Sequence, residues 1–138
     1  MRNGISGRLG WLLWGIAGSC GPATAEGPPA YEVRYLGDGW TATGINERGD
    51  ACGSVSPDGT SLLAGVSHDG GPFELLPLPP GMRTSRAHDI NDLGEIVGSV
   101  CANQYVITQP TAAVWRPSAD GYLVEVLGAL PGHPYSGA

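Results

Sequence analysis

The feature that most constrains the fold of this chain is a segment that occurs twice, 45 residues apart. Residues 45–55 read INERGDACGSV, and residues 90–100 read INDLGEIVGSV. In each copy an Asn-x-x-Gly turn leads into a short strand that ends in Gly-Ser-Val. Asn hydrogen-bonds the backbone of such a turn, and Gly takes the positive φ that closes it. The sequence therefore predicts a fold built from repeated units.

The likeness between the two halves extends beyond these segments. One set of identities, at a shift of 45 residues, lays Ala42, Ile45, Asn46, Gly49, Gly53, Ser54 and Val55 on Ala87, Ile90, Asn91, Gly94, Gly98, Ser99 and Val100. A second set, at a shift of 51, lays Thr60, Asp69, Gly70, Glu74, Leu76, Pro80, Gly81 and Ala87 on Thr111, Asp120, Gly121, Glu125, Leu127, Pro131, Gly132 and Ala138. The shifts differ by 51 − 45 = 6 residues, which predicts one insertion in the loop at residues 101–109.

Composition and patterning indicate that each unit is made of short strands. The 138 residues include 23 Gly and 12 Pro, which disfavour long helices, while a hydrophobic content of 41% disfavours disorder. Alternating or apolar runs bounded by turn residues predict strands at residues 31–36, 50–55, 60–66 and 73–78. We therefore expect an all-β fold made of repeats of short antiparallel strands in a single domain.

The period of 45–51 residues, with about four strands, is the size of one β-propeller blade. We expect a β-repeat domain at residues 26–138, with units at about 31–86 and 87–138, that forms a partial β-propeller of about two blades. The second unit stops where the first leads into its next Asn-x-x-Gly turn, so we expect it to be truncated. Two explanations stay open. Either the chain is a fragment of a longer array, or other copies of the chain cover its open blade edges.

The N-terminus has the pattern of an export signal. Arg2 and Arg8 accompany an apolar run at residues 9–17, and residues 23–25 read Ala-Thr-Ala, a small-x-small cleavage site. We expect a secretory signal peptide at residues 1–25 and a secreted or periplasmic protein. As an alternative, the segment before Cys20 resembles a bacterial lipoprotein box, which would leave the protein anchored through a lipid on Cys20.

Residues 87–99, AHDINDLGEIVGS, resemble the Ala-x-x-Ile-Asn-x-x-Gly-x-Val-Val-Gly core of the HAF repeats, a bacterial extracellular family named for a His-Ala-Phe motif. Residues 112–115, AAVW, lie where that family has His-Ala-Phe-x-Trp, and residues 126–132 are similar to its following Leu-Gly segment. The likeness covers about residues 31–138, although the His-Ala-Phe letters are absent. It implies an exported β-propeller-like repeat protein with no established catalytic residues.

Clustered acids in the second turn suggest a Ca²⁺ site but fit a structural turn better. The cluster comprises Asp89, Asn91, Asp92 and Glu95. An EF-hand loop needs a ligand at its fifth position, where this segment has Leu93. An Asx-turn with solvated acids is therefore favoured over a cation site.

The remaining candidates for catalysis or ligation also have structural explanations. The three histidines, His68, His88 and His133, do not recur between the units and have no partner at ligand spacing. Ser54 and Ser99 lack the second Gly of a Gly-x-Ser-x-Gly nucleophile elbow. We therefore assign no catalytic, cofactor-binding or metal-binding residue from the sequence, and no cofactor.

Cysteines and aromatic residues leave two further questions. The repeat register places Cys52 and Cys101 too far apart along the strands for a simple disulfide, which favours two separate thiols with Cys52 buried. Four aromatic residues could line a carbohydrate-binding or peptide-binding surface, although packing between blades is favoured. They are Trp40, Tyr105, Trp115 and Tyr122.

Together these features favour an exported, non-catalytic β-repeat protein with a binding or interaction role. The alternative is a secreted hydrolase or lyase module that uses acidic residues in turns. The formal charge of −6 and the lack of a basic cluster disfavour nucleic acid as a partner, and the apolar run is too short to span a membrane. The partners that remain are an unidentified ligand or protein, or further copies of the chain that bind through open blade edges.

Overall fold

The computed structural model describes residues 27, 30, 32–103, 109–133, 135 and 136. The chain divides into two units, Met1–Glu32 and Val33–Ala138, and the second unit contains every described strand. The expected signal peptide at residues 1–25, the lipid site at Cys20 and Tyr105 lie outside the described residues.

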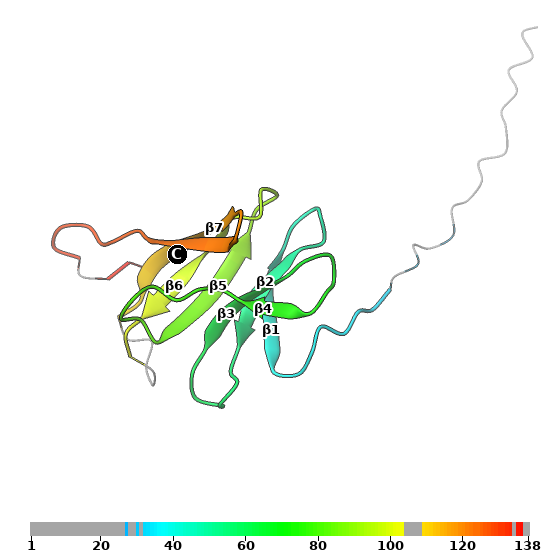
Figure 1. Cartoon of the computed structure of the whole chain (residues 1–138), viewed down its shortest axis with the longest axis horizontal. Helices are drawn as coiled ribbons and strands as arrows, with labels where there is room; N and C mark the ends of the chain where they lie inside the picture. Colours follow the sequence, from blue (N-terminus) through cyan, green and yellow to red (C-terminus); the bar gives the residue numbers. More distant parts are fainter. Residues whose placement is uncertain (1–26, 28–29, 31, 104–108, 134, 137–138) are drawn as a thin grey trace, which may run out of the picture. The chain divides into compact units, whose positions relative to one another are not determined.

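The unit from Val33 to Ala138 consists of two four-stranded antiparallel sheets (Figure 1). In each sheet every strand pairs with its neighbour along the chain, and the described residues contain no helix. The first sheet comprises β1 (Trp40–Ile45), β2 (Ala51–Val55), β3 (Leu63–Ser67) and β4 (Phe73–Leu75). The second comprises β5 (Thr84–Ile90), β6 (Ile96–Cys101), β7 (Thr111–Ser118) and β8 (Gly121–Val126). The all-β prediction is confirmed, and each sheet corresponds to one repeat.

The prediction of a strand at residues 31–36 is wrong. Residues 32–37 form no strand, and the alternating Val33 and Tyr35 side chains are exposed. Alternation predicts a strand only where a neighbouring strand and a packed face are present, and the first sheet instead begins at Trp40. The third strand also starts later than expected, because the Asp58 carboxylate accepts hydrogen bonds from the backbone of Thr60 and Ser61 and holds them in a turn.

The first two strands of each sheet superpose at the shift of 45 residues. β1 and β5 each carry an irregularity in register, between Ala42 and Gly44 and between Ala87 and Asp89. The same register brings the backbone of β1 or β5 against the Gly of each Gly-Ser-Val. A Cβ built on Gly53 would lie 2.2 Å from the Thr41 carbonyl oxygen, and one on Gly98 would lie 2.0 Å from the carbonyl oxygen of Arg86. Both repeats therefore need Gly there.

Beyond the second strand, the two repeats differ by two insertions instead of the predicted single one. Gly53 pairs with Gly65 and Gly98 pairs with Ala113, so β3 and β7 superpose at a shift of 113 − 65 = 48. Residues 56–62 and 101–110 therefore connect equivalent positions, and the second connection is three residues longer. The other three inserted residues lie in the β7–β8 hairpin, since β4 and β8 superpose at a shift of 51.

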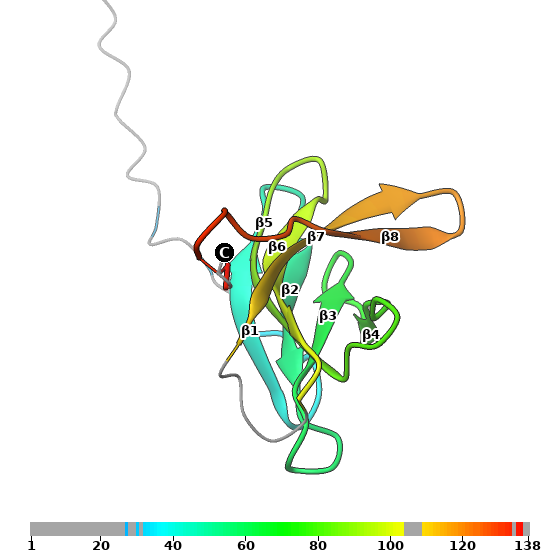
Figure 2. The ribbon, with the colours of Figure 1, turned by 90° about the vertical axis from the view of Figure 1, so that its left-hand side faces the viewer.

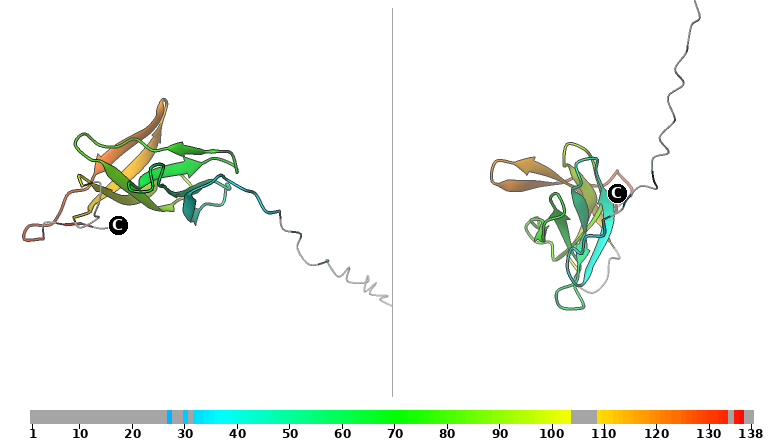
Figure 3. Two further views of the ribbon diagram at one scale, coloured as in Figure 1. Left: turned by 90° about the horizontal axis from the view of Figure 1, so that it is seen from below. Right: turned by 90° about the vertical axis from the view of Figure 1, so that its right-hand side faces the viewer.

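The second insertion lengthens the β7–β8 hairpin beyond its counterpart in the first sheet. Pairing of β3 with β4 ends at Ser67 and Phe73, whose counterparts are Trp115 and Val124. The second hairpin continues with three more pairs, up to Ser118 and Gly121. Figures 2 and 3 show this hairpin projecting beyond the other strands in views from different sides.

Each sheet has two faces, which we name by their equivalent residues. The back face carries Cys52, Ser54, Ala64 and Val66 in the first sheet and Val97, Ser99, Ala112 and Val114 in the second. The front face carries Ile45, Ala51 and Val55 in the first sheet and Ile90, Ile96 and Val100 in the second.

The core lies between the back face of the first sheet and the front face of the second. Cys52, Ala64 and Val66 form one cluster with Ile90, Ile96, Val100, Ala113 and Trp115. Trp115 is fully buried, and its Nε1 donates a hydrogen bond of 2.8 Å to the Pro77 carbonyl oxygen beyond β4. A four-stranded sheet alone leaves its apolar face in water, so each repeat depends on its neighbour for burial.

Candidate functional site: a cleft between the two repeats

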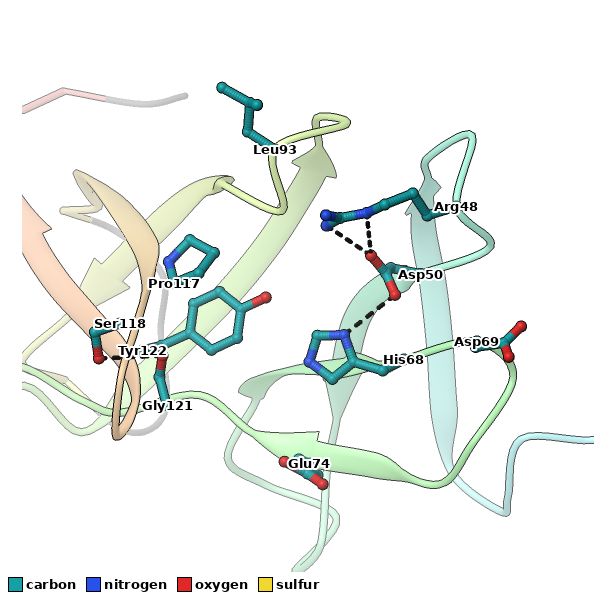
Figure 4. Close-up of a pocket in the computed structure, with 10 residues that line it drawn as sticks. All are labelled: Arg48, Asp50, His68, Asp69, Glu74, Leu93, Pro117, Ser118, Gly121 and Tyr122. Carbon is teal, nitrogen blue, oxygen red and sulfur yellow. Dashed lines mark hydrogen bonds and ion pairs between the residues drawn. The ribbon is translucent and has the colours of Figure 1, made fainter.

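A cleft of about 650 Å³ lies between the two sheets (Figure 4). From the first repeat it is lined by Arg48, Asp50, His68, Asp69 and Glu74. From the second it is lined by Leu93, Pro117, Ser118, Gly121 and Tyr122. Four of these last five belong to the extra part of the β7–β8 hairpin, so the longer hairpin forms one wall of the cleft.

Asp50 is the centre of the polar network in the cleft. Its Oδ2 atom accepts hydrogen bonds from Asn46 Nδ2 at 3.0 Å and Arg48 Nε at 3.1 Å, and lies 2.9 Å from Arg48 Nη2. Its Oδ1 atom lies 3.2 Å from His68 Nδ1. Burial raises the pKa of Asp50, but the hydrogen bonds from Asn46, His68 and Arg48 outweigh this effect and hold the pKa below its ordinary value.

The first Asn-x-x-Gly turn places Asp50 at this point. Asn46 Oδ1 accepts hydrogen bonds from the backbone nitrogens of Arg48 and Asp50, at 3.1 and 2.9 Å. The backbone nitrogen of Gly49 donates to the Asn46 carbonyl oxygen at 3.1 Å, and Gly49 has the expected positive φ of 82°. The Asx-turn thus fixes the start of β2, where Asp50 faces the second repeat.

Tyr122 forms the opposite wall of the cleft. Its ring lies roughly parallel to that of His68, with centroids 6.2 Å apart and an interplanar angle of 13° (Figure 4). The Tyr122 hydroxyl donates a hydrogen bond of 3.2 Å to the Gly94 carbonyl oxygen in the second turn. Burial, followed by the charge of Asp50, raises the pKa of Tyr122, so the phenol stays protonated at neutral pH.

The second turn is the predicted Asx-turn, but Asp92 and Glu95 bond to other residues instead of being simply solvated. Asn91 Oδ1 accepts hydrogen bonds from the backbone nitrogens of Leu93 and Glu95, at 3.0 and 2.9 Å, which confirms the expected Asx-turn. Asp92 Oδ1 accepts a hydrogen bond of 2.9 Å from the Glu47 backbone nitrogen in the first turn. In the part of the chain that the structure describes, no three His, Cys, Asp or Glu side chains are grouped to hold a metal ion.

The three histidines lie in different places. His68 lines the cleft beside Asp50. The His88 side chain, at the irregular position of β5, has Nε2 3.4 Å from the Ser99 Oγ on the back face of the second sheet. His133 is exposed in a turn closed by its backbone nitrogen, which donates to the Leu130 carbonyl oxygen. The structure does not bring them together.

The aromatic residues divide between packing and the cleft. Trp115 is a core residue, and Trp40 stacks on Phe73 with ring centroids 4.1 Å apart on the front face of the first sheet. Tyr122 is the aromatic residue of the predicted set that lines the cleft.

Cys52 and Cys101 are both buried, and no disulfide joins them. Burial raises the pKa of the Cys52 thiol, an effect partly offset by a hydrogen bond with Thr43 and reinforced by the charge of Asp89. The prediction of two separate thiols with a buried Cys52 is confirmed, and Cys52 packs in the core cluster.

Arg48, Asp50 and Glu74 were not predicted as cleft residues, because none of them belongs to the acidic cluster of the second turn and Glu74 recurs only as part of the repeat. Asp50 takes the place of Glu95 in the repeat, and each carboxylate accepts a hydrogen bond from the side-chain amide of its own turn asparagine. A basic and an acidic residue two positions apart beside a well-defined turn were the available signal. The opposite wall gave no signal, because the identities along the sequence predict the whole insertion in the loop at residues 101–109, not in the β7–β8 hairpin.

Comparison of the chain with protein-family models, with curated proteins and with solved structures finds no match. Among the described residues, no helix is long and apolar enough to cross a membrane. The geometry of the cleft and the relation between the repeats therefore carry the functional argument.

Proposed function

We propose that this chain is an exported, non-catalytic β-repeat protein that binds a positively charged group in the cleft between its two repeats. The architecture proposed for it is a partial β-propeller of the kind implied by the resemblance to HAF repeats. The ligand that we expect is the side chain of a Lys or Arg residue on a partner protein or peptide.

The observation that carries this proposal is the charge left in the cleft after its internal pairs are counted. Arg48 is held by Asp50, and their charges offset each other. Asp69 and Glu74 also line this space of about 650 Å³ from the first-repeat side, so acidic residues outnumber basic ones in its lining. The Arg34 guanidinium lies outside this lining and donates a hydrogen bond of 3.1 Å to the Asp69 carbonyl oxygen. The Tyr122 ring on the opposite wall supplies an aromatic surface, on which cations bind favourably.

Binding of short charged peptides tests the proposal. Isothermal titration should detect tri-lysine or tri-arginine and should not detect tri-glutamate. Glu74→Gln should weaken binding of the basic peptides about twofold to fivefold, as expected for loss of one exposed charge contact. Glu125→Gln is the matched control, because Glu125 is the equivalent residue of the second repeat and lies outside the cleft. Equal binding by Glu74→Gln, or no binding of either basic peptide, would contradict the proposal.

One observation favours the alternative of a secreted hydrolase or lyase. His68 Nδ1 contacts the buried Asp50 carboxylate, an arrangement that orients His for proton transfer in many enzymes. The turn acids do not favour it, because Asp92 and Glu95 hold the two turns and do not line the cleft. A hydrolytic activity on glycoside or peptide substrates that is lost in His68→Gln would support the alternative, whereas a variant that retains such activity would eliminate His68 as its base.

Export is part of the same proposal and is supported by the charged and apolar pattern of residues 1–25. Mass spectrometry of the protein recovered from outside the cytoplasm should find an N-terminus at Glu26. A mass that instead corresponds to diacylated Cys20 would identify the lipoprotein alternative, and retention of Met1 would contradict both.

A further inference from the structure

The contact between the two repeats has a direction. The back face of the first sheet packs on the front face of the second, and these are different faces of equivalent sheets. Among the described residues, no further repeat packs on two surfaces of the same two kinds. They are the front face of the first sheet and the back face of the second.

The open back face repeats the side chains of the covered one. In the structural register the shared residues are Ser54/Ser99, Ala64/Ala112, Val66/Val114, Glu74/Glu125 and Leu76/Leu127. Ala112 and Val114, at 5% and 8% exposed, are buried as Ala64 and Val66 are, but the environments differ sharply at two other apolar positions of this face. Leu76 is 5% exposed and its counterpart Leu127 is 53% exposed, while Cys52 is 0% exposed and its counterpart Val97 is 38% exposed.

The open front face also presents apolar residues that are covered in the other repeat. Ile90 is 6% exposed in the core, whereas the equivalent Ile45 is 72% exposed. The Trp40–Phe73 stack covers the middle of this face, because a Cβ on Gly65 would lie only 2.5 Å from Trp40 Cζ3. This face is therefore preformed and apolar.

The hydrogen bonds between the two turns could be made again on both open surfaces. At the seam, Asn46 Nδ2 donates to the Asn91 carbonyl oxygen at 3.1 Å, and the Glu47 backbone nitrogen donates to Asp92 Oδ1 at 2.9 Å. The second turn carries the same donor types, the Asn91 amide and the Asp92 backbone nitrogen. The first turn carries the same acceptor types, the Asn46 carbonyl oxygen and the Glu47 carboxylate.

We propose that a second copy of this chain docks head-to-tail, with the front face of its first sheet on the back face of the second sheet. The contact between the repeats within one chain is the template for the contact between chains. Such a heterologous contact generates a closed ring or an open filament. A closed ring of two copies would contain four sheets, the smallest number in known propellers. This interaction is separate from the cleft and does not depend on its ligand.

Sedimentation velocity of the full chain over a wide concentration range tests the proposal. We expect a mass that is a multiple of the chain mass and that falls on dilution. Val97→Glu, which spoils the back face, and Ile45→Glu, which spoils the front face, should each weaken association at least about tenfold, because each buries an unpaired carboxylate at the contact. Val33→Glu is the matched control, since Val33 is 95% exposed and lies outside both faces, and it should associate as the unchanged protein does.

Mixing the two variants gives the decisive result. The Val97→Glu chain keeps an intact front face and the Ile45→Glu chain keeps an intact back face, so an equimolar mixture should form a one-to-one dimer that neither forms alone. Circular dichroism of each variant must match the unchanged protein, and Leu127→Glu replaces Val97→Glu if the latter is unfolded. A monomer at about 100 μM, undiminished association of both variants, or no dimer in the mixture would each overturn the proposal.

Discussion

The two repeats share their turns almost atom for atom and differ in what surrounds them. Asn46 and Asn91 accept the same pair of backbone hydrogen bonds, and Gly49 and Gly94 have φ angles of 82° and 81°. Yet Ile45 is exposed where Ile90 is buried. The comparison teaches that local hydrogen bonding defines the repeat, whereas the position of a repeat in the stack decides which of its faces is covered.

The repeats also differ in the length of their last hairpin, and this difference creates the cleft. The pair of Pro117 with Tyr122 and the pair of Ser118 with Gly121 have no counterpart in the first sheet. All four residues line the cleft. The site of the proposed function is thus a product of the asymmetry between the repeats.

Replacing the central tryptophan of each repeat should give the largest difference in stability between the two repeats. Trp115→Ala removes a fully buried side chain and its hydrogen bond to Pro77, and should lower the free energy of unfolding by about 3–5 kcal/mol. Trp40→Ala, in the half-exposed stack on the first sheet, should cost about 1–2 kcal/mol. Urea denaturation followed by circular dichroism measures both. Equal losses would mean that the first sheet is covered as fully as the second.

Adding a methyl group at the two equivalent glycines should affect both repeats alike. Gly53→Ala and Gly98→Ala each force a Cβ against a backbone carbonyl oxygen, and each should cost about 2–3 kcal/mol. Gly27→Ala, where nothing lies within 4 Å, is the control and should leave the urea midpoint unchanged. A difference of more than about 1 kcal/mol between the first two variants would argue against a shared register.

Replacing the two turn asparagines should distinguish the stability contributed by hydrogen bonds within a repeat from that of the hydrogen bond between repeats. Asn91→Ala loses the bonds that hold its own turn and should cost about 1–2 kcal/mol. Asn46→Ala loses the equivalent bonds and also the bond to the Asn91 carbonyl oxygen, so it should cost about 1 kcal/mol more. Denaturant titration of both variants checks the order, and a reversed order would show that the seam bond contributes nothing.

Acid should reveal the contribution of Asp50. Its pKa in the folded protein lies below the ordinary value of 3.8, so its stabilising effect is complete above that value and is lost as the pH falls through the lower, folded pKa. At neutral pH Asp50→Asn should be less stable than the unchanged protein by about 1–2 kcal/mol. Thermal unfolding from pH 7 to pH 2 should show this difference shrinking in acid, whereas a constant difference would assign the loss to packing.

Local features could be predicted from the sequence because their causes are local. The Asx-turns, the Gly at the end of each turn and the strands that follow are set by a few adjacent residues. The segment at residues 32–37 has the same alternating pattern as a strand, but no neighbouring strand pairs with it. Pattern alone does not tell these two situations apart.

The cleft could not be predicted, because it depends on which loop or hairpin contains the inserted residues. Identities along the sequence do not decide that. A shift of 51 matched Thr60 with Thr111, although the paired strands place Leu63 opposite Val55 and Thr111 opposite Val100. The identities therefore did not predict that three of the six extra residues lie in the hairpin. The residues at its end, Pro117 and Tyr122, gave no sign of facing Asp50.

The lengthened hairpin has a consequence for how such a protein can diverge. Its extra residues lie past the last pair that the two sheets have in common, so changes at Pro117, Ser118 or Gly121 leave the shared strand register in place, whereas Tyr122 also packs against the core. Duplication of one unit supplies a stable scaffold with two matching turns. Three more pairs in a single hairpin add a wall that the other repeat lacks, and under the proposed function substitutions on that wall would alter what the cleft binds.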